Sequence, residues 1–134
     1  MLLAIDIGNT NISFGIFSAA KRGGCANIRG AKGDKIIKTF DLPSRQCSLN
    51  KFREKIGSLE ITDILICSVV PKLTNTITND LAGIFGKRPL VIGKDVRVPI
   101  KNCYRNPSQV GQDRLVNSYA GLIFYGAPLI IIYS

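Results

Sequence analysis

The spacing of apolar and polar residues changes along the chain, and its first part predicts three strands. Apolar residues cluster before and after the polar turn Gly8-Asn9-Thr10-Asn11, which is the pattern of a β-hairpin. A further apolar segment is ended by Pro43. The segment 19–33 follows neither hydrophobic period and is rich in Gly, Ala and basic residues, so we expect a flexible loop there. The three strands are expected at residues 2–7, 12–17 and 35–42.

The later part of the chain predicts helices that alternate with strands. Ser48 can cap a helix over residues 49–56, whose apolar residues share one face. The continuous apolar run at 61–70 predicts a strand that is covered on both faces. The remaining elements are expected as a helix at 73–85, a strand at 89–92, an extended connection at 96–104, and a helix from Pro107 or soon after to about Phe124.

This order of elements predicts an α/β fold with a mixed β-sheet and helices packed on it. Three strands joined by turns, followed by helix, strand, helix and strand, resemble the half-domain of ribonuclease H-like, actin-like ATPases. We place this domain at residues 1–127. The apolar segment 128–134 is then expected to be the first strand of a second domain.

Composition favours a soluble globular protein. The 134 residues are 46% hydrophobic and 20% charged, which suits one domain with its own core. No apolar stretch approaches the roughly 20 residues that cross a bilayer. Asp6 directly follows the apolar start of the chain, and no basic segment precedes it, so we expect no secretory signal, no membrane partner and a cytoplasmic location.

The four cysteines are scattered without a close pair, and the sequence contains no histidine, so we expect no structural zinc site. Cys67 lies in the apolar run 61–70, so we interpret it as a small core residue. We assign no chemistry to any cysteine.

The net charge of +9 comes mainly from the window 21–55, where ten basic and three acidic residues contribute +7. This window has no aromatic platform and no recognition-helix pattern, so a nucleic-acid partner is not favoured. We expect a solvated basic surface, with attraction of anionic substrates such as nucleotides as the alternative.

The segment Asp6-Ile7-Gly8-Asn9-Thr10-Asn11 is the first candidate site. A carboxylate at a strand end can hold Mg²⁺ directly or through water, Gly8 lets the backbone approach a phosphate, and the next two side chains can donate to phosphate oxygens. A plain hairpin turn explains the same residues, because Gly-Asn is common in such turns. The sequence contains neither a Walker-type loop nor a dinucleotide glycine fingerprint, so a phosphate site would have to use a turn of this kind.

The second candidate site is the segment 106–114, in which Asp113 and Arg114 adjoin in the expected first turns of a helix. A carboxylate there can accept a proton from an alcohol, and an arginine can grip a carboxylate or a phosphate. Alternatively, Asp113 stabilises the helix dipole beside a solvated Arg114. The residue types alone leave both interpretations open.

Together these segments resemble the type III pantothenate kinase family. The resemblance covers nearly the whole chain, from Met1 to about Ile132, apart from the loop 19–33. It implies an enzyme that uses ATP to convert pantothenate to 4′-phosphopantothenate, the first step of coenzyme A biosynthesis. The matching segments are Asp6-Ile7-Gly8-Asn9-Thr10-Asn11, Ser68-Val69-Val70-Pro71, Tyr104-Arg105-Asn106-Pro107 and Val110-Gly111-Gln112-Asp113-Arg114.

The resemblance implies a role for each matched residue. Asp113 would be the general base, and Asp6 would hold Mg²⁺ through water. The family reads Gly-Ala-Asp-Arg where this chain has Gln112, so that position departs from the pattern. The ATP phosphate loop would comprise Asp6, Ile7, Gly8, Asn9, Thr10, Asn11, Ile12 and Ser13. The pantothenate site would comprise Tyr104, Gly111, Gln112, Asp113 and Arg114.

The sequence stops where the family pattern continues. In the family, the strand that matches 129–132 leads into an Asp-(Phe/Leu)-Gly-Thr motif, which supplies a second phosphate loop and an aspartate for K⁺ or NH₄⁺. Tyr133 and Ser134 stand at the first two of those positions. Phosphoryl transfer depends on charge stabilisation from both sides of the phosphates, so we expect this chain to be truncated and inactive alone.

Two further expectations follow from the resemblance. Full-length members of the family are homodimers, with an interface that relies largely on the second half. The alternative hypothesis for function is a non-catalytic relative that binds nucleotide or nucleic acid, such as an accessory factor in transcription.

Overall fold

The structure is a computed structural model that describes residues 1–18, 35–46 and 48–133. The loop expected at 19–33 therefore lies outside the described residues, as do Cys25, Cys47 and part of the basic window 21–55.

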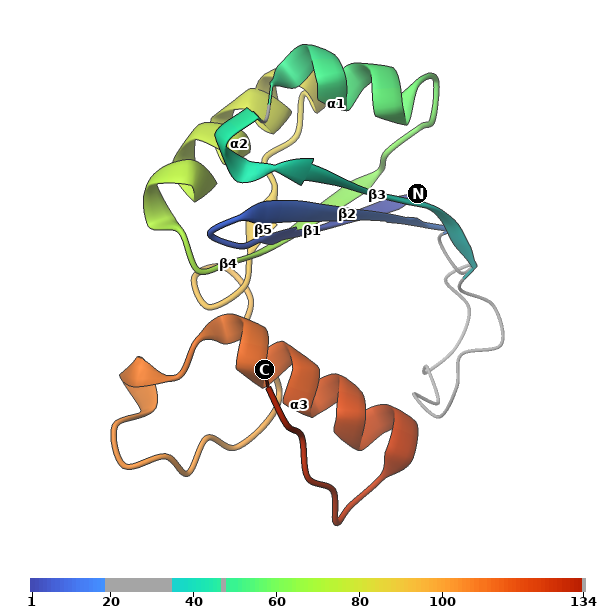
Figure 1. Cartoon of the computed structure of the whole chain (residues 1–134). Helices are drawn as coiled ribbons and strands as arrows, with labels where there is room; N and C mark the ends of the chain where they lie inside the picture. Colours follow the sequence, from blue (N-terminus) through green and yellow to red (C-terminus); the bar gives the residue numbers. More distant parts are fainter. Residues whose placement is uncertain (19–34, 47, 134) are drawn as a thin grey trace.

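Five strands form one mixed sheet in the order β3-β2-β1-β4-β5 (Figure 1). They are β1 (Leu2–Ile7), β2 (Asn11–Phe17), β3 (Ile36–Pro43), β4 (Asp63–Ser68) and β5 (Leu90–Val91). The first three pair antiparallel, whereas β1 with β4 and β4 with β5 are parallel. The predicted α/β class is confirmed, with the strand order of a ribonuclease H-like half-domain.

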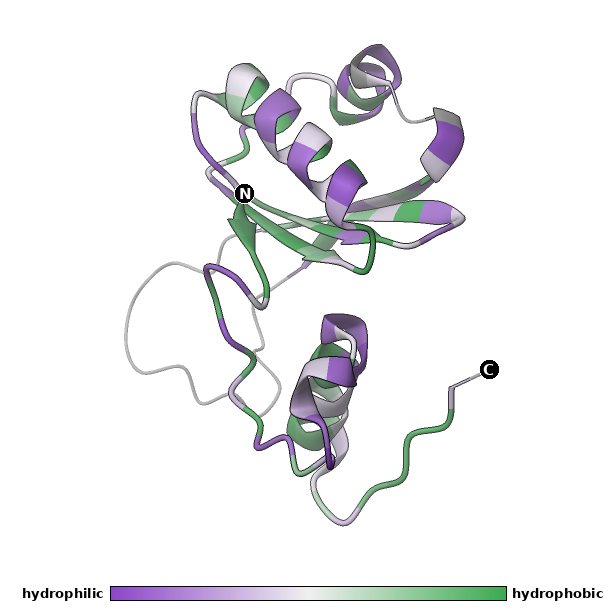
Figure 2. Cartoon of the chain, turned by 90° about the vertical axis from the view of Figure 1, so that its left-hand side faces the viewer, coloured by the Kyte–Doolittle hydropathy of each residue, from purple (hydrophilic) through white to green (hydrophobic). Residues whose placement is uncertain are grey.

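Helices cover both faces of this sheet (Figure 1). The helices α1 (Leu49–Ile56) and α2 (Pro71–Phe85) lie over one face, and α3 (Gln112–Tyr125) lies over the other. Figure 2 shows apolar strands beneath α2, whose outward side is largely hydrophilic. The core between the sheet, α1 and α2 contains Leu3, Ile5, Ile7, Ile12, Phe14, Ile16, Leu42, Phe52, Ile56, Ile64, Ile66, Ile77 and Leu81.

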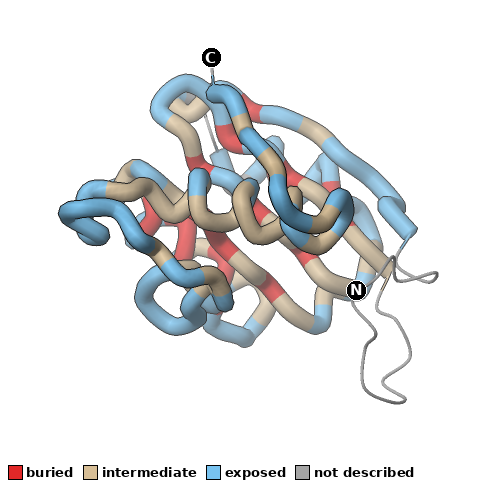
Figure 3. The backbone as a smooth tube through the Cα atoms, turned by 90° about the horizontal axis from the view of Figure 1, so that it is seen from below, coloured by how far each residue is buried: buried red, intermediate tan, exposed pale blue. Residues whose placement is uncertain are grey.

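The face of the sheet toward α3 is covered less completely. No residue of α3 is buried. Seen from below, the buried residues lie mainly in the strands and α3 contributes none of them (Figure 3). The helix therefore lies across the sheet without filling the space between them.

Most predicted elements are present, with shifted ends. Ser48 caps α1 as predicted, because its hydroxyl accepts a hydrogen bond from the Lys51 N–H at 3.4 Å. The helix predicted at 73–85 begins earlier, at Pro71, which suits the first turn of a helix. The helix predicted from Pro107 is divided into a 3₁₀ turn, η2 (Pro107–Gln109), and α3. A second 3₁₀ turn, η1 (Ser44–Gln46), follows β3.

The strand predicted near the end of the chain is not present in the structure. Residues 128–133 alternate as a strand would: Leu129 and Ile131 lie against Gly121 of α3, whereas Ile130 and Ile132 are 91% and 88% exposed. No described strand lies beside them, and a strand needs a hydrogen-bonded neighbour. The assignment of 128–134 to a second domain stays a prediction. None of the helices within the described ranges has the length and apolar character to span a membrane.

Candidate functional site

The hairpin turn between β1 and β2 is held in place by Ser44, the residue that follows β3. The Gly8 N–H donates to the Asn11 carbonyl at 3.0 Å. The Ser44 hydroxyl donates to the Gly8 carbonyl at 2.9 Å, and the Ser44 N–H donates to the Thr10 carbonyl at 2.8 Å. The side chains of Asn9, Thr10 and Asn11 remain exposed. The predicted phosphate loop is thus a braced turn with its polar side chains directed to solvent.

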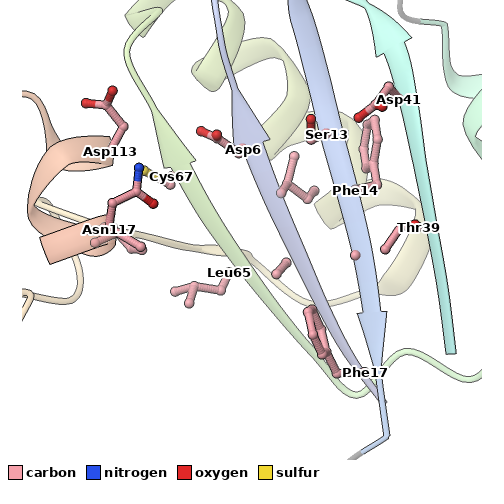
Figure 4. A pocket seen from close by; sticks show the side chains of 15 residues that line it. Asp6, Ser13, Phe14, Phe17, Thr39, Asp41, Leu65, Cys67, Asp113 and Asn117 are labelled. Atoms are coloured by element: carbon pink, nitrogen blue, oxygen red, sulfur yellow. The ribbon is translucent and has the colours of Figure 1, made fainter. Parts of the chain in front are cut away.

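Strand alternation divides the predicted loop residues between the two faces of the sheet. Ile7 and Ile12 are fully buried in the core, so they can offer only backbone atoms to a ligand. Asp6 and Ser13 are opposite each other in the β1–β2 register and are both exposed. Their side chains lie on the α3 side of the sheet (Figure 4).

Hydroxyl hydrogen bonds organise the chain between β4 and α2. The Ser68 hydroxyl accepts from the Val70 N–H at 3.0 Å and from the Thr74 hydroxyl at 2.6 Å. The Val69 N–H donates to the Ile7 carbonyl at 3.1 Å, which ties this segment to the end of β1. The Ser-Val-Val-Pro segment therefore connects the start of α2 to the strand end that carries the hairpin turn.

Gly111 precedes α3 and leaves room for the Asp113 carboxylate. Its backbone is extended, with φ −60° and ψ 145°. A Cβ atom at Gly111 would collide with an oxygen of the Asp113 carboxylate and would lie 3.9 Å from Val69. The Gly111 carbonyl accepts from the Arg114 N–H at 3.2 Å. The absence of a side chain at this position therefore allows the Asp113 carboxylate to lie over the start of the helix.

A cavity of about 400 Å³ lies between the sheet and α3 (Figure 4). Asp6 and Ser13 enter it from the hairpin, Cys67 from β4 and Asp113 from α3. The other lining residues are Ala4, Ile5, Phe14, Gly15, Phe17, Thr39, Asp41, Leu65, Ile92, Val116 and Asn117. The structure thus brings the two candidate motifs, which lie near opposite ends of the sequence, to one cavity.

Negative charge in this cavity is disfavoured. Burial, and then the charge of Asp113, raises the pKa of Asp6 above its ordinary value. Burial, followed by the charges of Asp6 and Asp113, raises the pKa of the Cys67 thiol to about 11. A bound cation would relieve this repulsion, because an opposite charge nearby favours the ionised form of a carboxyl group.

Of the five predicted substrate residues only Asp113 lines this cavity; the four that do not are Tyr104, Gly111, Gln112 and Arg114. Tyr104 is 60% exposed. Arg114 is exposed and its guanidinium lies 5.4 Å from the centre of the Tyr133 ring. Gln112 packs on Gly93, where an added Cβ atom would come within 2.7 Å of the Gln112 Cδ. The larger residue at this family position therefore rests against a glycine and does not crowd the cavity.

Comparison with known proteins identifies the family of the chain. A family model described as type III pantothenate kinase matches residues 2–134. The chain belongs to this family. Three curated relatives, each called a type III pantothenate kinase, come from Persephonella marina, Agathobacter rectalis and Moorella thermoacetica, and are 40%, 33% and 37% identical over 132 residues. These matches cover 98% of this chain but 50%, 49% and 50% of the respective relatives. The chain spans about half the length of the curated relatives it matches.

Three residues belong to the cavity or support the hairpin turn, although the sequence did not predict a site role for them. They are Ser44, Cys67 and Asn117. Cys67 is buried, as predicted, but it also lies in the cavity wall, where it is opposite Asp6 in the β1–β4 register. Asn117 follows Asp113 by one helical turn, which is a signal that the sequence does contain. The contacts of Ser44 depend on sheet pairing and have no local signal.

The composition of the cavity fits a magnesium ion that is bound together with phosphate. Within the described ranges, no group of three cysteine, aspartate or glutamate side chains could hold a metal ion by itself. Mg²⁺ usually keeps several waters and takes one or two carboxylates in addition to phosphate oxygens. Asp6 could serve as such a carboxylate, since burial and then the charge of Asp113 raise its pKa, and a nearby cation would favour its ionised form.

Proposed function

We propose that this chain forms the half of a type III pantothenate kinase in which ATP phosphates and pantothenate meet. The primary hydroxyl oxygen of pantothenate attacks the γ-phosphorus of ATP, the bond to the β-phosphate oxygen breaks, and ADP and 4′-phosphopantothenate result. The observation that carries this proposal is that Asp6 and Asp113, from two separate family motifs, line one cavity. The names of the relatives support the choice of substrate.

In this proposal, residues 6–13 hold the phosphates of ATP. Asn9 and Thr10 can donate from exposed side chains on a turn that Ser44 already braces, so little entropy is lost on binding. Asp6 holds Mg²⁺ through water, and when bound this ion supplies neutralisation of the phosphate charge. The monovalent cation implied by the resemblance has no assigned ligand among residues 1–134.

Asp113 accepts the hydroxyl proton of pantothenate as the P–O bond forms. A well-placed general base contributes roughly 10²- to 10⁴-fold in rate. Tyr104, Gly111, Gln112 and Arg114 belong to the substrate side in this proposal, but only Gly111 has a direct structural relation to the base, through the space it leaves. The Arg114 guanidinium stacks over the Tyr133 ring, so it would have to move away from this ring to contact a substrate.

The test of the proposal uses ATP, Mg²⁺, K⁺ or NH₄⁺, and pantothenate, with 4′-phosphopantothenate detected by mass spectrometry. The chain is assayed alone and joined to the second half of the Persephonella marina relative, because it spans about half of that protein. We expect turnover from the joined protein and little from the chain alone. A folded joined protein without turnover, beside an active P. marina parent, would contradict the proposal.

Variants of the joined protein test the base and its surroundings. Asp113→Asn should lower turnover by roughly 10²- to 10⁴-fold. Gly111→Ala should lower it in the same direction, because the new methyl group displaces the Asp113 carboxylate. Gly83→Ala is the matched control, since an added Cβ atom there meets nothing within 4 Å. Equal activity of the two glycine variants would show that Gly111 does not position the base.

A further inference from the structure

Asn117 has an unused amide at the wall of the cavity. It lies on α3 and lines the same cavity as Asp113. Figure 4 shows its side chain projecting from α3 toward β4, the strand that carries Leu65 and Cys67. Its amide forms no hydrogen bond with the rest of the chain at 1–18, 35–46 and 48–133.

Many residues of the cavity wall are apolar, among them Ala4, Leu65, Ile92 and Val116, and the strand that Asn117 faces carries Leu65 and Cys67 (Figure 4). An amide in such a wall is hydrated in the free protein. When a ligand displaces this water, the amide needs a polar partner on the ligand, because a buried donor or acceptor without one costs about 1–3 kcal/mol. A site of this kind discriminates strongly between ligands that offer a hydrogen-bonding group there and ligands that do not.

The spacing between Asp113 and Asn117 matches a particular ligand group. Positions four residues apart on a helix are separated by about 6 Å along its axis. In pantothenate, standard bond lengths place the amide about 5–6 Å from the primary hydroxyl oxygen. Three carbons separate the hydroxyl oxygen from the amide, and the middle one carries two methyl groups, which suit contact with Leu65 and Val116.

We propose that Asn117 binds the amide group of pantothenate while the primary hydroxyl lies at Asp113. The two residues together select ligands in which these two groups have the matching separation. The inference rests on the proposed function. Asn117 offers both a donor and an acceptor, and the ligand amide has both as well. A ligand that has the hydroxyl but no amide at this distance would leave Asn117 without a partner.

The experiment is calorimetric titration of the chain with pantothenate and with pantothenol. Both ligands have the hydroxyl, the two methyl groups and the amide, but pantothenol has an alcohol in place of the carboxylate. Asn117→Ala should weaken both by the same factor, roughly 3- to 10-fold, which corresponds to one lost neutral hydrogen bond. Asn117→Asp keeps the size of the side chain and removes its donor, so it should weaken pantothenate at least as much.

Asn79→Ala is the matched control, because Asn79 is an exposed asparagine in the interior of α2 and does not line this cavity. Alanine has a higher helix propensity than asparagine, so we expect both Asn117→Ala and Asn79→Ala to fold. Unchanged affinity of Asn117→Ala would overturn the inference while leaving the proposed function intact. A loss confined to pantothenate would also overturn it, because it would place Asn117 at the carboxylate. If the unaltered chain binds neither ligand, the proposed function fails as well.

Discussion

The reactivity of Cys67 tests whether Asp6 and Asp113 meet at one cavity, and it can be measured without enzymatic activity. Burial and the two carboxylates raise the pKa of this thiol to about 11 from a reference of 9.0. At pH 8 the thiolate fraction falls from roughly 9% to about 0.1%, a factor of about 90. The more basic thiolate is also a better nucleophile, which raises the reaction rate of each thiolate by a factor of about 6–10. The net suppression of the reaction is therefore about tenfold, apart from the limited access to a side chain that is 8% exposed.

The perturbation is removal of one charge at a time, with Asp6→Asn and Asp113→Asn. Asparagine has nearly the shape of aspartate, so access to the thiol is preserved. Each variant should raise the rate of Cys67 modification at a fixed pH below about 10, with the larger effect for Asp6→Asn, because Asp6 is the stronger of the two charges on this thiol. Asp41→Asn is the control: Asp41 lines the same cavity but is not among the causes of the Cys67 shift.

The assay follows reaction with a small disulfide reagent between about pH 7.5 and 10, where thiolate formation limits the rate. Peptide mapping by mass spectrometry assigns the rate to each cysteine, and the exposed Cys103 serves as an internal standard for the reagent. If the profiles of all three variants coincide, or if Cys67 in the unaltered chain titrates near 9, the carboxylates do not lie beside the thiol. The shared cavity would then be wrong, and the proposed function would lose its main support.

Two predictions concern stability. Because the pKa of Asp6 is raised in the folded state, its contribution to stability is complete below about pH 3.8 and is lost as pH rises through the folded-state pKa. Asp6→Asn should therefore raise the midpoint of urea unfolding at pH 7. The same variant should have no such effect at pH 3. A stabilising effect that is equal at both pH values would contradict the electrostatic cause. Ile66 is fully buried in the interior strand β4, so Ile66→Ala should lower the free energy of unfolding by about 2–5 kcal/mol in urea titrations. Ile37→Ala, at a position 42% exposed in β3, should cost far less, and similar losses would argue against the assigned core.

Much of the fold could be predicted because its signals are local. Apolar residues on both sides of the polar turn at Gly8 mark β1 and β2, and Ser48 caps α1. The segment after Pro128 shows the limit of such signals. Its apolar run predicts a strand, but a strand exists only beside a partner, and no local pattern states whether one is present.

The sequence by itself determined the family, the element types and the two motifs that contain Asp6 and Asp113. Only the tertiary structure decided that these carboxylates share a cavity with Cys67 and Asn117, that Gly111 leaves space for the Asp113 carboxylate, and that Gln112 rests on Gly93. The physical reason is that alternation assigns a residue to a face of its own strand or helix. Which faces meet depends on the parallel pairing of β1 with β4 and on the side of the sheet that α3 covers, and both are contacts between segments far apart in the chain.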